Sequence, residues 1–341
     1  MKYKGGLEMV DLASRRQFLK GGTAVAAGAA AGVLSPFGSF AAAPAPVRWA
    51  SLMPGFTVLV TEFIRHHKLD EKNGFRLGAP TEYTTVPTYY GDFVAGNYDV
   101  CIGSWDSFAT RYLGQVPIKL LCTITTAEMI CILAARDTGK ALDGLKGKVL
   151  AAPQSTGTYR IAQAVLREHV GLDIETWMRV QNVTNPAASV TLLRTRSADA
   201  ALSWEPNVAS GMAADKDLRV IFNAGQTYRE KTGADLPYFG VAVRSELLAK
   251  DPAIAARLNG VFKQCVDGIM GNVPDAVKIV GDRTGFAPAV LQEAITSGRL
   301  RFVFNTMTDP AARAGVTAAA QFFARNELLS GVPDGGFFIQ S

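Results

Sequence analysis

The chain has 341 residues, of which 48% are hydrophobic, so it is long enough for about two domains with buried cores. Its formal net charge is +5, but five of the 35 basic and two of the 30 acidic residues lie within residues 1–43. The remainder carries 30 basic against 28 acidic residues, a balance that gives no field for collecting phosphates and argues against a nucleic-acid partner.

Residues 1–43 are predicted to be an export signal. Residues 14–20 read Ser-Arg-Arg-Gln-Phe-Leu-Lys, which resembles the twin-arginine export motif, and residues 21–33 form a weakly apolar stretch of Ala and Gly. Cleavage is expected after Ala41 or Ala42, because Pro44 is a poor residue directly after a cut. An uncleaved membrane anchor is the alternative, but the apolar run is short and lacks Leu and Ile. We therefore expect the twin-arginine machinery as a partner and a soluble protein in the periplasm.

The four cysteines are spread along the chain, at Cys101, Cys122, Cys131 and Cys265. None lies near the cleavage site, which excludes a lipid anchor on a new N-terminal cysteine. The first three fall in apolar runs, where a buried small side chain is the usual role. A disulfide is possible in the periplasm, but the spacing does not indicate a pair.

From residue 47 onward, short apolar runs alternate with helical spacing, which predicts α/β layers with mostly parallel strands. Strands are expected at residues 47–51, 82–85, 98–102, 118–125, 129–135, 149–152, 178–181, 200–202 and 238–243. Helices are expected at residues 57–69, 89–94, 108–113, 157–170, 187–195, 246–250, 253–272, 275–284, 287–296 and 310–326. The long runs 118–125 and 129–135 are expected to cross between two lobes.

The segment 149–159 reads Val-Leu-Ala-Ala-Pro-Gln-Ser-Thr-Gly-Thr-Tyr, a buried strand followed by the start of a helix. The first N–H groups of a helix have no intrahelical partner and lie at the positive end of its dipole. The turn over residues 154–158 is therefore a candidate anion site. The alternative is that Ser155 or Thr156 only caps the helix.

Three further strand ends carry aromatic, hydroxyl or acidic residues, and ligands of open α/β sheets bind beyond such ends. Asp106 and Glu205 each follow a Trp. They are interpreted as carboxylates at a helix start, as counter-charges for a ligand amine, or as an acid–base pair. The candidate ligand-binding residues are Pro54, Phe56, Ser104, Trp105, Asp106, Gln154, Ser155, Thr156, Gly157, Thr158, Trp204 and Glu205.

Motifs of the common enzymes are missing. Residues 144–148 read Gly-Leu-Lys-Gly-Lys but lack the interval of a phosphate loop, and no dinucleotide fingerprint, nucleophile elbow or His-Glu-x-x-His occurs. His66 and His67 are neighbours on one predicted helix and cannot chelate as an i, i+4 pair would. The sequence therefore predicts no catalytic residue, no metal and no cofactor.

Three segments carry a family resemblance. Residues 93–100, 142–151 and 199–206 read Phe-Val-Ala-Gly-Asn-Tyr-Asp-Val, Leu-Asp-Gly-Leu-Lys-Gly-Lys-Val-Leu-Ala and Asp-Ala-Ala-Leu-Ser-Trp-Glu-Pro. In order and spacing they resemble the periplasmic substrate-binding proteins of ABC importers for nitrate, sulfonates, taurine and bicarbonate. One departure is Arg194-Thr195-Arg196-Ser197, where the family usually has Gly; these arginines are either solvated or an additional anion contact.

The resemblance implies the type II periplasmic binding protein fold, an α/β fold with two hinge-linked lobes and a ligand cleft between them. Lobe 1 would comprise residues 47–136 and 241–341, and lobe 2 residues 140–238. Ser155, Thr156 and Thr158 would grip an oxyanion such as a sulfonate, taurine or nitrate. The implied partners are a small anion or zwitterion and an ABC permease with its ATPase at the inner membrane.

Three alternatives remain open at this point. The chain is a binding protein for a thiamine-pyrimidine precursor or another aromatic small molecule, an enzyme on the same fold, or a sensor feeding a receptor. The thiamine-pyrimidine enzymes of this fold use a cysteine-rich cluster, whereas the four cysteines here are isolated.

Overall fold

The computed structural model of the protein describes residues 45–138 and 141–340, and the predicted export signal lies outside these residues. The strands are β1 (Ala50–Leu52), β2 (Thr81–Tyr83), β3 (Val100–Ser104), β4 (Ile118–Thr125), β5 (Ile130–Ala135), β6 (Val149–Ala152), β7 (Arg179–Asn182), β8 (Ala200–Trp204), β9 (Leu218–Asn223), β10 (Phe239–Arg244) and β11 (Phe302–Thr306).

The α-helices are α1 (Thr57–His66), α2 (Leu69–Lys72), α3 (Val86–Ala95), α4 (Trp105–Leu113), α5 (Gly157–Val165), α6 (Ile174–Trp177), α7 (Pro186–Arg194), α8 (Asn207–Ala214), α9 (Ala224–Thr232), α10 (Ser245–Lys250), α11 (Ile254–Gly271), α12 (Val273–Val280), α13 (Pro288–Thr296) and α14 (Pro310–Arg325). Short helical turns include η1 (Ala127–Met129) and the π-helical η4 (Leu166–Val170), which continues α5.

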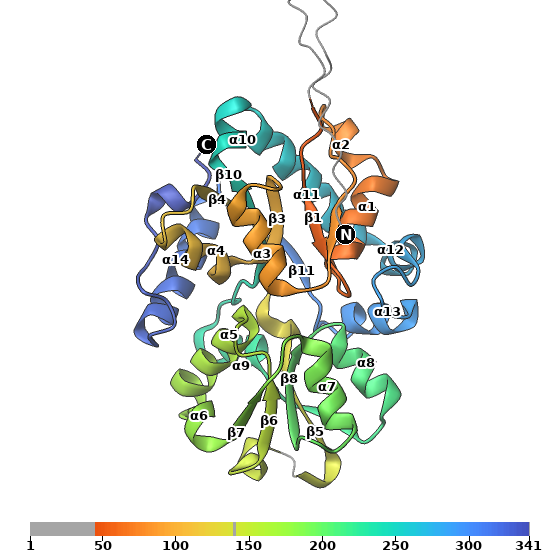
Figure 1. Cartoon of the computed structure of the whole chain (residues 1–341), viewed down its shortest axis with the longest axis vertical. Coiled ribbons are helices and arrows are strands. Elements are labelled where there is room, and N and C mark those ends of the chain that lie inside the picture. The colour runs from red at the N-terminus through yellow and green to blue at the C-terminus, as the bar shows by residue number, and fades with distance from the viewer. Residues whose placement is uncertain (1–44, 139–140, 341) are drawn as a thin grey trace, which may run out of the picture. The chain divides into compact units, whose positions relative to one another are not determined.

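Two larger sheets organise the described residues. The four-stranded sheet has the order β11-β4-β10-β3, and the five-stranded sheet has the order β7-β6-β8-β5-β9. Helix α4 packs beside β3 and β10, whereas α7 and α8 pack beside β8 (Figure 1). Strands β1 and β2 pair with each other in a separate parallel ribbon, which lies against β3 through a bridge between Trp49 and Val100.

The expectation of mostly parallel strands is wrong for the four-stranded sheet. Its pairs β10–β3, β10–β4 and β11–β4 are all antiparallel. In the five-stranded sheet, β6 is parallel to β7 and β8, but β5 is antiparallel to β8 and β9. The chain reaches β5 from the four-stranded sheet and reaches β10 from the five-stranded sheet. Each of these strands is therefore antiparallel to its neighbours from local β-α-β units.

The chain crosses between the two sheets twice, and the crossing segments pair with each other. The first segment leads from β4 through η1 to β5, and the second leads from α9 to β10. They are joined by a bridge between Thr126 and Pro237 and by a hydrogen bond from Ala127 N to Leu236 O at 2.9 Å. The division into two lobes stays a prediction. Strand β5 falls within residues 47–136, predicted for lobe 1, yet it pairs in the five-stranded sheet.

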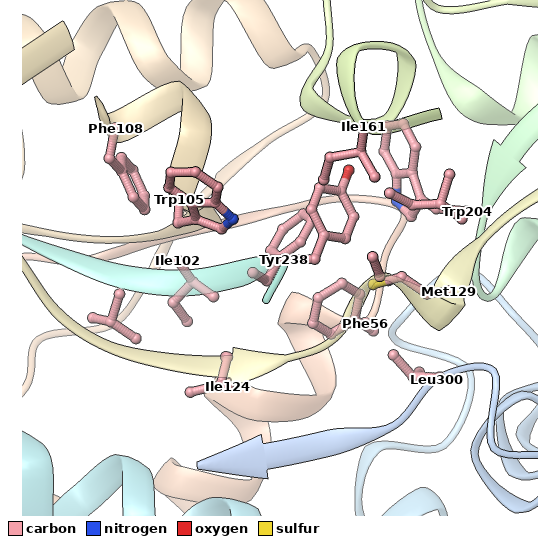
Figure 2. Packing of buried hydrophobic residues seen from close by; sticks show 14 of the residues in the cluster. Phe56, Ile102, Trp105, Phe108, Ile124, Met129, Ile161, Trp204, Tyr238 and Leu300 are labelled. Carbon is pink, nitrogen blue, oxygen red and sulfur yellow. The ribbon is translucent and has the colours of Figure 1, made fainter. Parts of the chain in front are cut away.

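Buried apolar residues from both sheets form one hydrophobic cluster. Figure 2 shows Phe56, Met129, Trp204 and Tyr238 together near the crossing segments, with Ile102 and Ile124 along the four-stranded sheet. This shared core fixes the strand ends of both sheets close to one another. Two smaller clusters lie within the five-stranded sheet and its helices.

Helix starts and stops follow local sequence signals. Asn185 caps α7 and Asp309 caps α14, each accepting a backbone N–H and each followed by a proline in the first turn. Helix α3 ends at Gly96, whose φ of 83° lies in the left-handed region that glycine tolerates. Within residues 45–138 and 141–340, no helix combines the length and apolar character needed to cross a membrane.

Candidate ligand-binding site

A cavity of about 340 Å³ lies where the ends of β3 and β8 meet the starts of α4 and α5. Both sheets contribute to it, since Ser104 ends β3 and Trp204 ends β8. Its lining residues are Leu52, Val86, Pro87, Tyr89, Tyr90, Ser104, Ser107, Thr110, Arg111, Ser155, Thr156, Gly157, Arg160, Trp204, Tyr238 and Phe239. Among these described residues, the charged ones are Arg111 and Arg160.

Arg160, the fourth residue of α5, brings a guanidinium to the cavity. Its Nε donates to Asp106 Oδ2 at 2.7 Å, and its Nη2 donates to Ser107 Oγ at 2.9 Å. Asp106 and Ser107 belong to the first turn of α4, so this interaction links elements of the two sheets. Burial lowers the pKa of Arg160, but the charge and hydrogen bond of Asp106 outweigh it and the pKa is raised. The guanidinium therefore stays charged.

Arg111 supplies the second cation. Its guanidinium carbon lies 4.3 Å from the centre of the Tyr90 ring, and its Nη1 donates to Ser107 O at 2.7 Å. The Tyr90 hydroxyl accepts a hydrogen bond from Ser104 N at 3.0 Å. Burial raises the pKa of Tyr90 to about 12, so this hydroxyl stays neutral. Arg111 therefore lies against a neutral tyrosine, whereas Arg160 is paired with a carboxylate.

Thr156 is the cap of α5. Its hydroxyl donates to Pro153 O at 2.7 Å and accepts from Tyr159 N at 3.4 Å. The N–H groups of Gly157 and Thr158 occupy the first two helical positions, which have no intrahelical partner. The Thr156 hydroxyl therefore caps the helix, and the helix start also borders the cavity, whereas the anion site at this turn stays a prediction.

Gly157 lets the start of α5 approach the start of α4. A Cβ atom on Gly157 would lie 2.5 Å from Asp106 Oδ1 and 2.7 Å from Ser104 Oγ, closer than packed atoms allow. Glycine is thus needed here for space, because the starts of α4 and α5 approach each other closely at this point.

The remaining lining is largely apolar and aromatic. Leu52, Val86, Pro87 and Phe239 lie on elements of the four-stranded sheet and its neighbours, whereas Trp204 comes from the five-stranded sheet. Trp204 is buried beside Met129 and Ile161 (Figure 2). Such a wall suits a ligand with an apolar body next to its charged group.

Five of the predicted residues line the cavity, namely Ser104, Ser155, Thr156, Gly157 and Trp204. Contact between these five residues and a ligand stays a prediction. The other seven predicted residues do not line the cavity, because their packing and hydrogen-bond partners lie far away in the sequence or within the core.

Trp105 and Phe56 belong to the core and not to the cavity wall. Trp105 is fully buried, stacks on Phe323 and donates from Nε1 to Pro237 O at 2.8 Å. Phe56 packs edge-on against Phe239 at 4.8 Å between ring centres. Both side chains lie in the buried core (Figure 2): Trp105 is the first residue of α4, and Phe56 directly precedes α1.

Pro54, Gln154 and Thr158 lie near the cavity but not on its lining. Pro54 follows a cis peptide bond and packs against Gly285. Gln154 bonds sideways to Glu175, and the Thr158 hydroxyl shares a 2.5 Å hydrogen bond with Tyr238.

Asp106 and Glu205 are fully buried and each pairs with an arginine instead of facing the cavity. Glu205 accepts from Arg299 Nε at 2.5 Å and from Ala209 N at 2.9 Å. The prediction that these two carboxylates contact a ligand amine is therefore wrong, because each one is paired with an arginine of the chain itself. Arg194 and Arg196 are exposed and do not line the cavity, which removes the anion-contact alternative for them.

The cavity is also lined by residues that were not predicted from the sequence, among them Ser107, Arg111, Arg160 and Tyr238. One signal was available for Arg160. A cation so close to a helix start opposes the helix dipole, and such a placement needs a local anion or a functional reason. Asp106 is that local anion, but the two residues are 54 positions apart and only the fold brings them together.

No protein-family model matches the chain, and no curated protein matches it by sequence. Solved structures resemble it over most of its length. The aliphatic sulphonate binding protein SsuA from Escherichia coli gives a TM-score of 0.70 at 14% identity, covering 87% of this chain and 93% of that chain. The alkanesulfonate-binding protein SsuA from Xanthomonas axonopodis pv. citri, solved with MOPS, gives 0.71 at 16% identity, covering 88% and 100%.

The chain has the type II periplasmic binding protein fold. A third structure with this fold, a putative periplasmic sulfonate-binding protein from Methylobacillus flagellatus, gives a TM-score of 0.65 at 16% identity, covering 87% of this chain and 92% of that chain. All three are named as binding proteins, and the third is also named as part of a putative sulfonate ABC transporter. The expected fold class is confirmed.

Within the periplasmic binding protein fold of this chain, no group of His, Cys, Asp or Glu side chains among the described residues is arranged to hold a metal ion. All four cysteines are buried and free.

Proposed function

We propose that the chain is the solute-binding component of an ABC importer in the periplasm and captures a small organic anion in the cavity. The observation that carries this proposal is the guanidinium pair of Arg111 and Arg160 on a lining whose other described residues are neutral. Guanidinium groups bind sulfonate and carboxylate oxygens through paired N–H donors. The start of α5 adds backbone donors and the positive end of its dipole on the same side.

The ligand's body is proposed to be apolar and to lie against the wall made by Val86, Pro87, Trp204 and Phe239. Sulfonates with an alkyl or aryl group combine such a body with one anionic head. The similar solved structures are named for sulfonates, which supports this class. A taurine-like zwitterion has less support, because its ammonium would meet no carboxylate among the described lining residues.

Titration calorimetry with a panel of ligands tests the proposal. The panel comprises alkyl and aryl sulfonates, taurine, nitrate, bicarbonate and an aminopyrimidine. We expect the sulfonates with an apolar group to bind more tightly than nitrate, bicarbonate or taurine. Tight binding of the neutral pyrimidine with no binding of any anion would overturn the oxyanion proposal and favour the aromatic alternative.

Uptake of a labelled sulfonate by cells distinguishes an importer component from a sensor. Cells lacking this chain are expected to lose uptake of a labelled sulfonate that the purified protein binds. Normal uptake, combined with an altered transcriptional response to the sulfonate, would instead assign the chain to a sensor pathway. Recovery of the sulfonate unchanged after incubation with the protein is expected, since we propose that the site holds its ligand without converting it.

A further inference from the structure

We propose that Asp106 makes the cavity selective for ligands with a single negative charge, acting as a positioning residue through Arg160. The inference rests on the proposed function, because it concerns which anions the site accepts. It starts from a carboxylate that is buried inside an anion site without lining it.

Asp106 is held behind the cation that faces the cavity. Its Oδ2 lies 2.5 Å from Arg160 Nη2 and 2.7 Å from Arg160 Nε, and its side chain is fully buried. Gly157 covers Oδ1, which has no hydrogen-bond partner within the described residues. The carboxylate therefore cannot reach a ligand directly, but it fixes one edge of the Arg160 guanidinium. Among the described residues, Nη1 of Arg160 makes no hydrogen bond, which leaves this end of the guanidinium for an anion.

The charges around the cavity add up to one positive unit. Arg111 and Arg160 contribute two positive charges and Asp106 contributes one negative charge. Tyr90 and Tyr238 also face this group, and burial raises the pKa of each hydroxyl, so both are neutral. A ligand with one negative charge is balanced in this site. A second negative charge would be uncompensated and would be repelled by Asp106 in a poorly solvated environment.

Benzenesulfonate and phenyl phosphate form a matched pair of probes. They share the phenyl group, but the sulfonate carries one charge at any pH used, whereas a phosphate monoester carries two above a pKa of about 6. In calorimetry at pH 8, we expect the wild-type protein to prefer benzenesulfonate by at least about tenfold. On lowering the pH to 5, the affinity for phenyl phosphate should rise while that for benzenesulfonate stays level. This measurement needs no variant.

Asp106→Asn tests the residue itself. The substitution keeps an acceptor for Arg160 and removes one negative charge, so the preference for benzenesulfonate at pH 8 should shrink about tenfold. The starts of α4 and α5 attract both probes and are unchanged by the substitution. Glu62→Gln is the matched control, because Glu62 is also a buried carboxylate paired with arginines, but it lies on α1 outside the cavity lining. The control should keep the wild-type preference.

The outcomes separate the two proposals. Equal binding of the two probes to the wild-type protein at pH 8 would overturn the selectivity inference and leave the anion site intact. A preference that Asp106→Asn does not change would also overturn it, provided that the variant melts cooperatively. If Asp106→Asn does not fold, the pH dependence of phenyl phosphate binding to the wild-type protein decides alone. Failure of both probes to bind would remove the proposed function and this inference together.

Discussion

At the scale of single residues, Thr156 at the start of α5 both caps the helix and borders the cavity. The Thr156 hydroxyl is engaged by Pro153 O and Tyr159 N, so it is a structural cap even though it borders the cavity. A polar residue that borders a cavity therefore does not necessarily contact a ligand. Its internal partners must be counted first.

Thr156→Val should lower the free energy of unfolding by about 1 kcal/mol, because it removes the cap of α5. Urea unfolding followed by circular dichroism measures this change, and Thr156→Ser should restore most of it. A Val variant with unchanged stability but much weaker sulfonate binding would show that the hydroxyl serves the ligand instead of the helix.

Gly157→Ala should weaken sulfonate binding more than tenfold, because the added Cβ would collide with Asp106 Oδ1 and Ser104 Oγ and push α4 and α5 apart. The matched control is Gly315→Ala in α14, where a Cβ would meet no atom within 4 Å. The control should keep its affinity and gain up to about 1 kcal/mol of stability from helix propensity. Equal affinities in the two variants would contradict the close approach of α4 and α5.

At the scale of elements, the sequence predicted most strands and helices but not the direction of the strands. The apolar runs of β4 and β6 were located with their full bounds, since each is flanked by clear turn residues. Strands β9 and β11 were missed, because Leu218–Asn223 and Phe302–Thr306 are short, only partly buried and placed between helices. The antiparallel order of the four-stranded sheet depends on β10 returning from the other sheet, which local periodicity does not encode.

The candidate site was predictable only where local sequence signals mark a helix start. Hydroxyl residues and a glycine between a strand and a helix indicate a helix start, so Ser155, Thr156 and Gly157 were predicted, and all three line the cavity. Whether the neighbouring Trp105 or Asp106 faces a cavity depends on packing and on distant partners such as Phe323 and Arg160. Such pairings over long sequence distances become visible only in the folded chain.

The junction between β8 and α8 gives a prediction on pH dependence. Burial raises the pKa of Glu205 above its usual 4.5, and Arg299 offsets this only in part. A carboxyl group with a raised pKa in the folded state adds most stability below pH 4.5 and loses that contribution as the pH rises through its folded pKa. The stability of the wild-type protein relative to Glu205→Gln should therefore decline from pH 4 to pH 8.

Urea unfolding of both proteins across this pH range measures the difference. Glu246→Gln is the control, because Glu246 pairs with Arg244 at the surface and its side chain is 51% exposed. The comparison separates the effect of the buried carboxylate from the general effect of removing a carboxylate. A difference for Glu205→Gln that grows with pH would mean that Arg299 dominates and lowers the pKa of Glu205.

At the scale of the whole molecule, the proposed periplasmic location depends on residues 1–43. We propose that residues 14–20 direct the chain to the twin-arginine route, so replacing Arg15 and Arg16 together by Lys should abolish export. Cell fractionation with an antibody against the chain measures the result, and Lys4→Gln should export normally. Full export of the double variant would place the chain on another route.

The buried cysteines have a consequence for experiments on the intact protein. Burial raises the pKa of the Cys101 thiol to about 12 and also raises the pKa values of the thiols of Cys122, Cys131 and Cys265. A thiolate is the reactive form, so the native protein should be nearly inert to maleimide dyes at neutral pH. Pairs of cysteines introduced on the surfaces of the two sheets can therefore carry fluorophores without removal of the native thiols. The distance between the fluorophores would then follow the opening of the cavity as ligand is added and withdrawn.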